Sequence, residues 1–283
     1  MKKRLREILS EVLPHEDLVS IYNSYDIVGD IAVIRTIETS RKHIRLVAEA
    51  ILNIHRNVST VLTQASPVEG DLRLRKLNHV AGTNRTSTRH KEFGCQFSVD
   101  IARCYFSPRL SNERMRIAEQ VGSGEVVVNM FAGVGCFSIV AARYSHARTI
   151  YSIDINPLAI EFMRENIRLN EVYGKVIPIL GDAKQVIAES LCDKADRVLM
   201  PLPEKALEYL PYALQALKPA GGWIHYYDFQ HAKRDENPVD KVKLKVAERL
   251  EHLCADFCFR FGHVLRTTGP NWHQVVLDIC IDS

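Results

Sequence analysis

The sequence lacks the features that mark membrane and secreted proteins. No apolar run among its 283 residues approaches the length of about 20 residues that a membrane-spanning helix needs. The start, Met1–Leu18, carries basic residues that are followed at once by acidic ones, which is unlike a secretory signal. We therefore expect a cytoplasmic protein with no membrane partner.

Cysteine pairs and the common catalytic motifs are also scarce. The seven cysteines are scattered, and the pair Cys254 and Cys258 has no second pair that would complete a zinc site. The chain contains no H-E-x-x-H motif, no serine-nucleophile elbow and no phosphate-loop lysine. These absences predict reduced structural thiols and no metal site.

A strong overall charge is missing as well, since the formal net charge is only +3. Any surface for nucleic acid must therefore be local. Basic side chains outnumber acidic ones between Arg73 and Arg116. Basic residues in turns usually just face water, so a solvated face is the alternative to a phosphate-binding surface.

The first third of the chain mixes short strands with an amphipathic helix. Gly29 interrupts a β-rich segment at residues 24–37 and indicates a turn between two strands. Apolar residues then recur at helical spacing, at Ile44, Val47, Ala48, Ile51 and Leu52. Further strands and basic turns follow, so we expect a smaller α+β domain over residues 1–103.

From about Gly122 the pattern changes to alternating strands and helices. Buried strands are predicted within residues 124–135, 149–157, 175–183, 196–203, 221–229 and 273–281, with helices between them, including one over 239–258. Strands that alternate with helices are typical of a parallel sheet. The second domain, residues 104–283, is thus predicted to be α/β, with a doubly wound, Rossmann-like fold.

The ends of three predicted strands carry the residues of a nucleotide-type cofactor site. Gly133 and Gly135 allow a tight turn ahead of a helix N-terminus. Asp154, about 20 residues on, ends the next strand and can accept hydrogen bonds from both ribose hydroxyls. Asp182 ends the third strand and can border a bound adenine. With the adjoining Ile155 and Ala183, this spacing fits S-adenosylmethionine at least as well as NAD; the alternative is a purely structural turn.

A fourth strand runs into two prolines. Pro201 and Pro203 have no N–H and a fixed φ, so they should end the strand at Met200 and hold the next residues extended. Ligands of open parallel sheets bind outside the carboxyl ends of the strands. We therefore expect this corner to face a ligand.

Several stretches together resemble a known enzyme family. They are "FSPRLSNERMRIAEQV", "VVVNMFAGVGCFSIVAAR", "IDINPLAIEFMRENIRLN", "RVLMPLPEKA" and "GPNWHQVVLDI". Over residues 20–283 the sequence resembles the archaeal and eukaryotic type of tRNA (guanine-N1)-methyltransferase that acts on position 37. The resemblance implies a class I methyltransferase domain that uses S-adenosylmethionine, preceded by an RNA-binding domain.

The resemblance also implies roles for individual residues. Glu113 matches the proposed general base, and Arg73 matches the residue proposed to stabilise the guanine O6. Tyr105 and Phe131 match aromatic residues that contact the cofactor. The corresponding alternatives are a helix-surface carboxylate paired with an arginine, a basic turn residue and aromatic core packing. Pro201 stands where many relatives have an asparagine that can hold the guanine edge, so backbone carbonyls would serve instead.

Three functions follow from these expectations. The first is methylation of guanosine N1 at position 37 of tRNA, in the anticodon loop, by a monomer that lacks the additional N-terminal module of many relatives. The second is the aminocarboxypropyl transfer of wybutosine synthesis, catalysed by a sister family with most of the same framework. The third, suggested by Pro201, is a tRNA-docking protein that binds the cofactor without turnover.

Overall fold

The computed structural model describes residues 5–10, 15, 18, 25–35 and 43–282. The parts of the predicted elements at residues 24, 36–37 and 41–42 lie outside this described part. The chain divides into two compact units, Met1–Arg109 and Leu110–Ser283.

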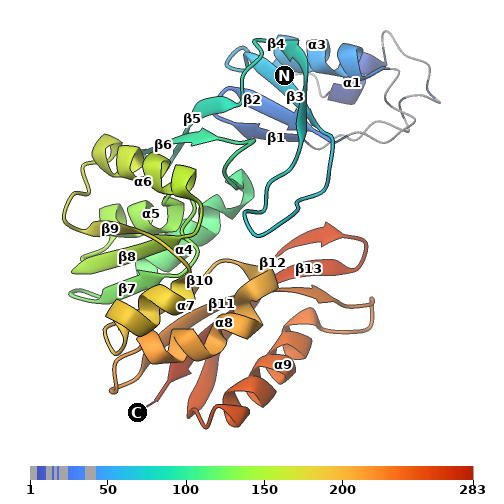
Figure 1. The fold of residues 1–283 in the computed structure, drawn as a ribbon. Helices are drawn as coiled ribbons and strands as arrows, with labels where there is room; N and C mark the ends of the chain where they lie inside the picture. Colours follow the sequence, from blue (N-terminus) through green and yellow to red (C-terminus); the bar gives the residue numbers. More distant parts are fainter. Residues whose placement is uncertain (1–4, 11–14, 16–17, 19–24, 36–42, 283) are drawn as a thin grey trace. The chain divides into compact units, whose positions relative to one another are not determined.

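The first unit contains a mixed four-stranded sheet and a separate hairpin (Figure 1). In the sheet, β2 and β3 are parallel and are connected through α3, while β1 and β4 pair antiparallel at the edges. The elements of this unit are α1 (Leu5–Leu9), β1 (Tyr25–Val28), β2 (Ile31–Ile34), α3 (Ile44–Ile54), β3 (Thr60–Gln64), β4 (Leu77–Gly82), β5 (Ser87–Glu92) and β6 (Cys95–Asp100). A short 3₁₀ turn, η2 (Pro108–Leu110), leads into the second unit.

The helix and the glycine turn of this unit were predicted from the sequence, and the structure contains both. The buried side of α3 includes Val47, Ala48 and Ile51, which pack on the sheet. Gly29 has a φ of 57° in the turn between β1 and β2. A Cβ there would lie 2.2 Å from the hydroxyl oxygen of Thr88 on β5, so the hairpin can approach this turn only because the residue is glycine.

The second unit contains a seven-stranded sheet in the order β12-β13-β11-β10-β7-β8-β9. Strands β9, β8, β7, β10 and β11 are parallel, and β13 is antiparallel to both of its neighbours. Its elements are α4 (Ser111–Gln120), β7 (Val126–Asn129), α5 (Cys136–Tyr144), β8 (Thr149–Asp154), α6 (Pro157–Leu169), β9 (Val176–Leu180), α7 (Ala183–Val186), a π turn η3 (Ile187–Leu191), β10 (Arg197–Met200), α8 (Pro203–Ala216), β11 (Gly222–His231), α9 (Pro238–His252), β12 (Phe257–Gly269) and β13 (Trp272–Ile281).

Helices cover both faces of this sheet, as a doubly wound fold requires (Figure 1). The face with Val128, Met200 and Tyr226 packs against α7, α8 and α9, whose buried residues include Leu210 and Leu250. Helices α5 and α6 contact β8 and β9, and α4 packs on α5. The predicted α/β fold and its doubly wound architecture are thus confirmed.

Two details of the predicted elements were wrong. The helix predicted over residues 239–258 ends at His252, because Leu253 to Asp256 turn the chain into β12, a strand that the sequence pattern did not reveal. The sheet is also not wholly parallel. β12 and β13 are joined by the two-residue turn Pro270–Asn271, which forces them to run antiparallel.

Buried α9 residues offer a test of this packing. Leu250 is fully buried, whereas Leu244 on the same helix is 67% exposed. Leu250→Ala should lower the free energy of unfolding of the second unit by about 2–5 kcal/mol, and Leu244→Ala should change it by less than about 0.5 kcal/mol. Both tryptophans, Trp223 and Trp272, lie in this unit, so their fluorescence in a denaturant titration reports its unfolding. Equal effects of the two substitutions would contradict the assigned core.

Candidate functional site

The carboxyl ends of four parallel strands meet at one edge of the second unit's sheet. Asn129, which ends β7, pairs with residues of both β8 and β10, and the ends of β8 and β9 pair directly with each other. The loops that follow these strands therefore emerge side by side. Such an edge is where open parallel sheets bind their ligands.

The loop after β7 is a glycine turn that leads into α5. Gly133 and Gly135 have φ values of 56° and 92°, in the left-handed region that favours glycine. A Cβ on Gly135 would lie 2.7 Å from Cγ of Met163 on α6, so the turn has no room for a side chain there. This close approach places the N-terminus of α5 at the edge.

Asp154 fixes this glycine turn to the end of β8. Its carboxylate accepts hydrogen bonds from the backbone N–H groups of Gly133, at 2.6 Å, and of Asn156, at 2.9 Å. Burial raises the pKa of Asp154, and the two N–H donors only partly offset this effect. The next residue, Ile155, leaves 42% of its surface exposed and so offers an apolar patch beside the carboxylate.

Tyr209, which was not predicted, contacts both Asp182 and Phe131. The Tyr209 hydroxyl, on α8, lies 3.0 Å from both carboxylate oxygens of Asp182. Its ring contacts Phe131 edge to face at 5.2 Å, and the buried Ala183 begins α7 directly after Asp182. Burial and the nearby carboxylate raise the pKa of Tyr209, which remains a hydrogen donor. The sequence does carry a signal for this contact, since Tyr209 lies on the apolar stripe of a predicted helix. A tyrosine buried there needs a hydrogen-bond partner for its hydroxyl.

The strand ends at the prolines as the sequence predicted, but the next residues form a tight turn instead of staying extended. β10 ends at Met200, whose carbonyl accepts the Leu202 N–H at 2.8 Å across a three-residue turn centred on Pro201. Pro203 then starts α8. Because the Met200 carbonyl accepts the Leu202 N–H and the Leu202 carbonyl accepts the Lys205 N–H, the Pro201 carbonyl is the better candidate for a ligand.

Asn129 holds the glycine turn through hydrogen bonds from the end of β7. It is fully buried, its amide donates to Ser138 on α5 at 3.1 Å, and its oxygen lies 3.4 Å from the Phe131 N–H. The residue thus connects the end of β7 with both sides of the turn.

Glu113 belongs to a second polar cluster, on the α4 side of the sheet. It is 5% exposed, and Arg116 donates to its two oxygens through Nε and Nη2, each at 2.7 Å. The Tyr227 hydroxyl donates to Oε1 at 2.7 Å. Glu113 is therefore not the exposed helix carboxylate that was its alternative interpretation, although it does pair with an arginine.

The cluster continues through Asp278 on β13. Arg116 donates to its two oxygens at 2.6 and 3.0 Å, and Nδ1 of His225 lies 2.6 Å from Oδ1. Burial alone would raise the pKa of Asp278, but the hydrogen bonds from His225 and Arg116 outweigh it and lower the pKa below the usual range. The pairing of Glu113 with Arg116 is local, three residues apart on one helix. Tyr227 and Asp278 were not predicted, because no local pattern shows that residues so far apart meet.

Arg73 and Tyr105 contact each other within the first unit. The Arg73 guanidinium carbon lies 4.1 Å from the centre of the Tyr105 ring, a cation–π contact. Arg73 also has a φ of 54°, which is uncommon for a residue with a side chain. The structure therefore brings these two predicted residues together in one unit. The predicted residues Phe131, Gly133, Gly135, Asp154, Ile155, Asp182, Ala183 and Pro201 follow the four adjoining strands of the other unit.

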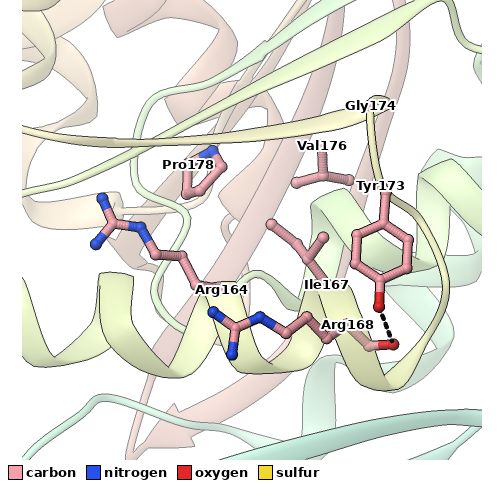
Figure 2. A pocket seen from close by; sticks show the side chains of 7 residues that line it. All are labelled: Arg164, Ile167, Arg168, Tyr173, Gly174, Val176 and Pro178. Atoms are coloured by element: carbon pink, nitrogen blue, oxygen red, sulfur yellow. Dashed lines mark hydrogen bonds between the residues drawn. The ribbon is translucent and has the colours of Figure 1, made fainter.

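A hollow of about 270 Å³ lies away from these loops, between α6 and β9 (Figure 2). Arg164 and Arg168 of α6 border it together with the exposed Tyr173, whose hydroxyl lies 3.4 Å from the Arg168 carbonyl oxygen. Three carboxylates, Glu161, Glu165 and Glu171, occur on the same helix and the turn after it. The local charge thus favours no anion, and we assign no ligand to this hollow.

The described residues contain neither a cluster of metal ligands nor a membrane-spanning helix. Within them, no three histidine, cysteine or acidic side chains cluster as a metal site would require. None of the helices in the described part of the chain is long and apolar enough to cross a bilayer.

Comparison with known proteins identifies the family. Residues 88–254 match the TRM5/TYW2 methyltransferase domain, and residues 5–86 match the TYW2 N-terminal domain. The chain belongs to the TRM5/TYW2 methyltransferase family. The expected resemblance, including the sister relationship between its two branches, is thereby confirmed.

Three members of this family illustrate both branches. The tRNA (guanine(37)-N(1))-methyltransferase Trm5b of Pyrococcus abyssi is 43% identical over 96% of this chain and 78% of its own length. The tRNA(Phe) (4-demethylwyosine(37)-C(7)) aminocarboxypropyltransferase of Methanocaldococcus jannaschii is 34% identical over 89% and 96%. A solved complex of aTrm5 and tRNALeu is 37% identical, with a TM-score of 0.85, over 100% of this chain and 79% of that one.

The buried His225 predicts a pH dependence of stability. Arg197 can only donate, so Nε2 of His225, 2.7 Å away, accepts and the ring is neutral with its hydrogen on Nδ1. Burial lowers the pKa of His225. The unfolded chain therefore takes up a proton near the ordinary pKa of about 6.5, whereas the folded protein does so only at lower pH.

The free energy of unfolding of the second unit should consequently fall as the pH is lowered from 7.5 to 5.5, by up to about 1.4 kcal/mol per pH unit from this one group. His225→Asn should flatten that slope, and His263→Asn, at an exposed position, should leave it unchanged. Denaturant titrations followed by tryptophan fluorescence measure the slopes. Parallel curves for the wild-type protein and His225→Asn would contradict the neutral, buried state of this histidine.

Proposed function

We propose that this protein is a tRNA methyltransferase that uses S-adenosylmethionine to form 1-methylguanosine at position 37. The observation that carries this function is the 43% identity with Trm5b of Pyrococcus abyssi, which extends over 96% of the chain and so includes both units. The strand-end geometry of the second unit supports it, because Gly133, Asp154 and Asp182 are arranged as such a cofactor needs.

The loops after β7, β8 and β9 fit a bound adenosine. Asp154 keeps acceptor positions beyond its two backbone hydrogen bonds and would receive the ribose hydroxyls. The exposed side chain of Ile155 would cover one face of the adenine, and Asp182 with the Ala183 N–H would meet its polar edge. Gly133, Gly135 and Phe131 would border the methionine part. When bound, S-adenosylmethionine supplies a methyl group on a positively charged sulfur.

The residues predicted to act on guanine have complementary chemistry. N1 carries a proton, which a base must accept, and O6 gains negative charge as that proton leaves. We assign the base to Glu113 and the stabilisation of O6 to Arg73, whose guanidinium is always charged. The contact of Arg73 with Tyr105 would restrain that guanidinium. The corner at Pro201 would present its backbone carbonyl to the guanine.

The first unit is proposed to bind tRNA. The solved complex of aTrm5 with tRNALeu is the support for a tRNA partner. The basic side chains from Arg73 onward would neutralise phosphates of the anticodon arm, and the target base would leave its loop to reach the enzyme. The domain limits of residues 1–103 and 104–283, the monomeric state and the cytoplasmic location remain predictions. The seven cysteines all lie in the described residues, and the absence of a disulfide among them is in keeping with a reducing compartment.

Aminocarboxypropyl transfer is the second candidate function. It is favoured by the match of residues 5–86 to the TYW2 N-terminal domain and by the 34% identity with the Methanocaldococcus jannaschii aminocarboxypropyltransferase. The higher identity with Trm5b, together with "DINP" and "MPLP" at the ends of β8 and β10, favours methyl transfer.

Isotope-labelled cofactor separates the candidates. The protein is incubated with S-adenosylmethionine labelled either on the methyl carbon or on the carboxyl carbon, and with tRNA that carries guanosine or 4-demethylwyosine at position 37. We expect methyl label in the guanosine-containing tRNA and 1-methylguanosine in its nucleoside digest. Carboxyl label in the tRNA would identify the second candidate. Binding of cofactor and tRNA without incorporation of either label would identify a docking protein.

Asp154 provides a separate test of the cofactor site. Asp154→Asn removes the charge that strengthens hydrogen bonds to the ribose, a contribution of about 1.5–3 kcal/mol. Binding of S-adenosylmethionine, measured by calorimetry, should weaken roughly 10- to 100-fold. The matched control is Asp196→Asn, since Asp196 accepts the Val126 N–H at the opposite end of the sheet. Unchanged binding by a folded Asp154→Asn variant would rule out this cofactor position.

A further inference from the structure

The hydrogen bonds of Glu113 leave one acceptor position open. An ionised carboxylate has about four such positions, two on each oxygen. Oε1 accepts from Nη2 of Arg116 and from the Tyr227 hydroxyl, while Oε2 accepts only from Nε of Arg116. The remaining position therefore belongs to Oε2.

The arginine that holds Glu113 is itself immobilised. Arg116 uses one edge of its guanidinium for Glu113 and the other for Asp278, and the Phe261 ring lies 4.8 Å from the guanidinium carbon. Asp278 also accepts from His225 and from Gln120, at 2.6 and 3.2 Å. The Glu113 carboxylate is thus anchored through four elements of the second unit, α4, β11, β12 and β13.

Tyr227 ties this carboxylate to the ligand-binding edge of the sheet. The preceding residue, Tyr226, pairs with Met200 at the end of β10, so Tyr227 lies level with the start of the proline corner. Its fully buried ring contacts Phe137, in the first turn of α5, edge to face at 6.0 Å. Glu113 therefore lies on the α4 side of the same edge that bears the glycine turn.

We propose that Tyr227 is a positioning residue for the methyl transfer. Its hydroxyl occupies Oε1 of Glu113 and so directs the open position of Oε2 toward the guanine. As the new N1–C bond forms and the C–S bond breaks, the N1 proton passes to Oε2, and the sulfur leaves as a neutral thioether. Tyr227 and Arg116 keep their hydrogens throughout. This role rests on the proposed function, because it requires Glu113 to be the base.

Tyr226 offers a matched control on the same strand. It is also fully buried, its hydroxyl donates to the Asp228 carboxylate at 2.9 Å, and it faces the opposite side of the sheet. Tyr227→Phe and Tyr226→Phe each remove one hydroxyl that donates to a carboxylate. Any general cost of such a deletion to the fold should therefore occur in both variants.

The experiment measures single-turnover methyl transfer with saturating tRNA and S-adenosylmethionine, together with the dissociation constants of both. Tyr227→Phe should slow transfer roughly 10- to 100-fold, because a misplaced base loses its alignment with N1, and should leave both dissociation constants within about twofold. Tyr226→Phe should retain the wild-type rate. Thermal unfolding of each variant confirms that the protein remains folded.

A wild-type rate in Tyr227→Phe, or equal losses of rate in the two variants, would overturn this role while the proposed function stands. A loss confined to the dissociation constants would likewise assign Tyr227 to binding rather than to positioning. If the wild-type protein transferred no methyl group, the proposed function would fail first, and the role of Tyr227 would fail with it.

Discussion

The parallel pairing of β7, β8, β9 and β10 is the constraint on which the rest of the structure depends. Parallel strands require crossover connections, and here helices provide them, so every loop after a strand emerges at the same edge. The hydrogen bond from the Gly133 N–H to Asp154 then fixes two of these loops to each other. A glycine turn, two acidic strand ends and a proline corner, spread over about 70 residues of sequence, thereby form one site.

A second constraint comes from charges buried beside this edge. Removing Glu113, Arg116 and Asp278 from water is costly, and only close pairing with well-placed hydrogen bonds offsets that cost. A second buried arginine is paired in the same way beside this cluster, where Arg197 donates to Glu125 and to His225. Buried ionic clusters are weak evidence for stability, but they fix geometry well. A fixed carboxylate is what proton transfer from a ring nitrogen needs, because a base acts only from within hydrogen-bond distance.

Local patterns in the sequence predicted the parts of the fold that local chemistry determines. Pro201 and Pro203 end β10 at Met200 because they cannot continue a strand ladder, and Gly133 and Gly135 mark the turn because other residues disfavour positive φ. The position of Asp154 followed from its place at a strand end. By contrast, Arg116 meets Asp278 across 162 residues, and Tyr209 meets Asp182 from a different helix. Such contacts follow from the packing of the whole sheet, which also makes β12 a strand despite its weak pattern.

The central claim is that the loops after β7, β8 and β9 hold S-adenosylmethionine with its methyl group toward the corner at Pro201. A crystal structure of the protein with this cofactor tests the claim most directly. We expect both ribose hydroxyls within hydrogen-bond distance of Asp154, the adenine between Ile155 and Asp182, and the methyl carbon facing the loop after β10. A cofactor bound at another edge of the sheet, or with its methyl group directed away from that loop, would contradict the account.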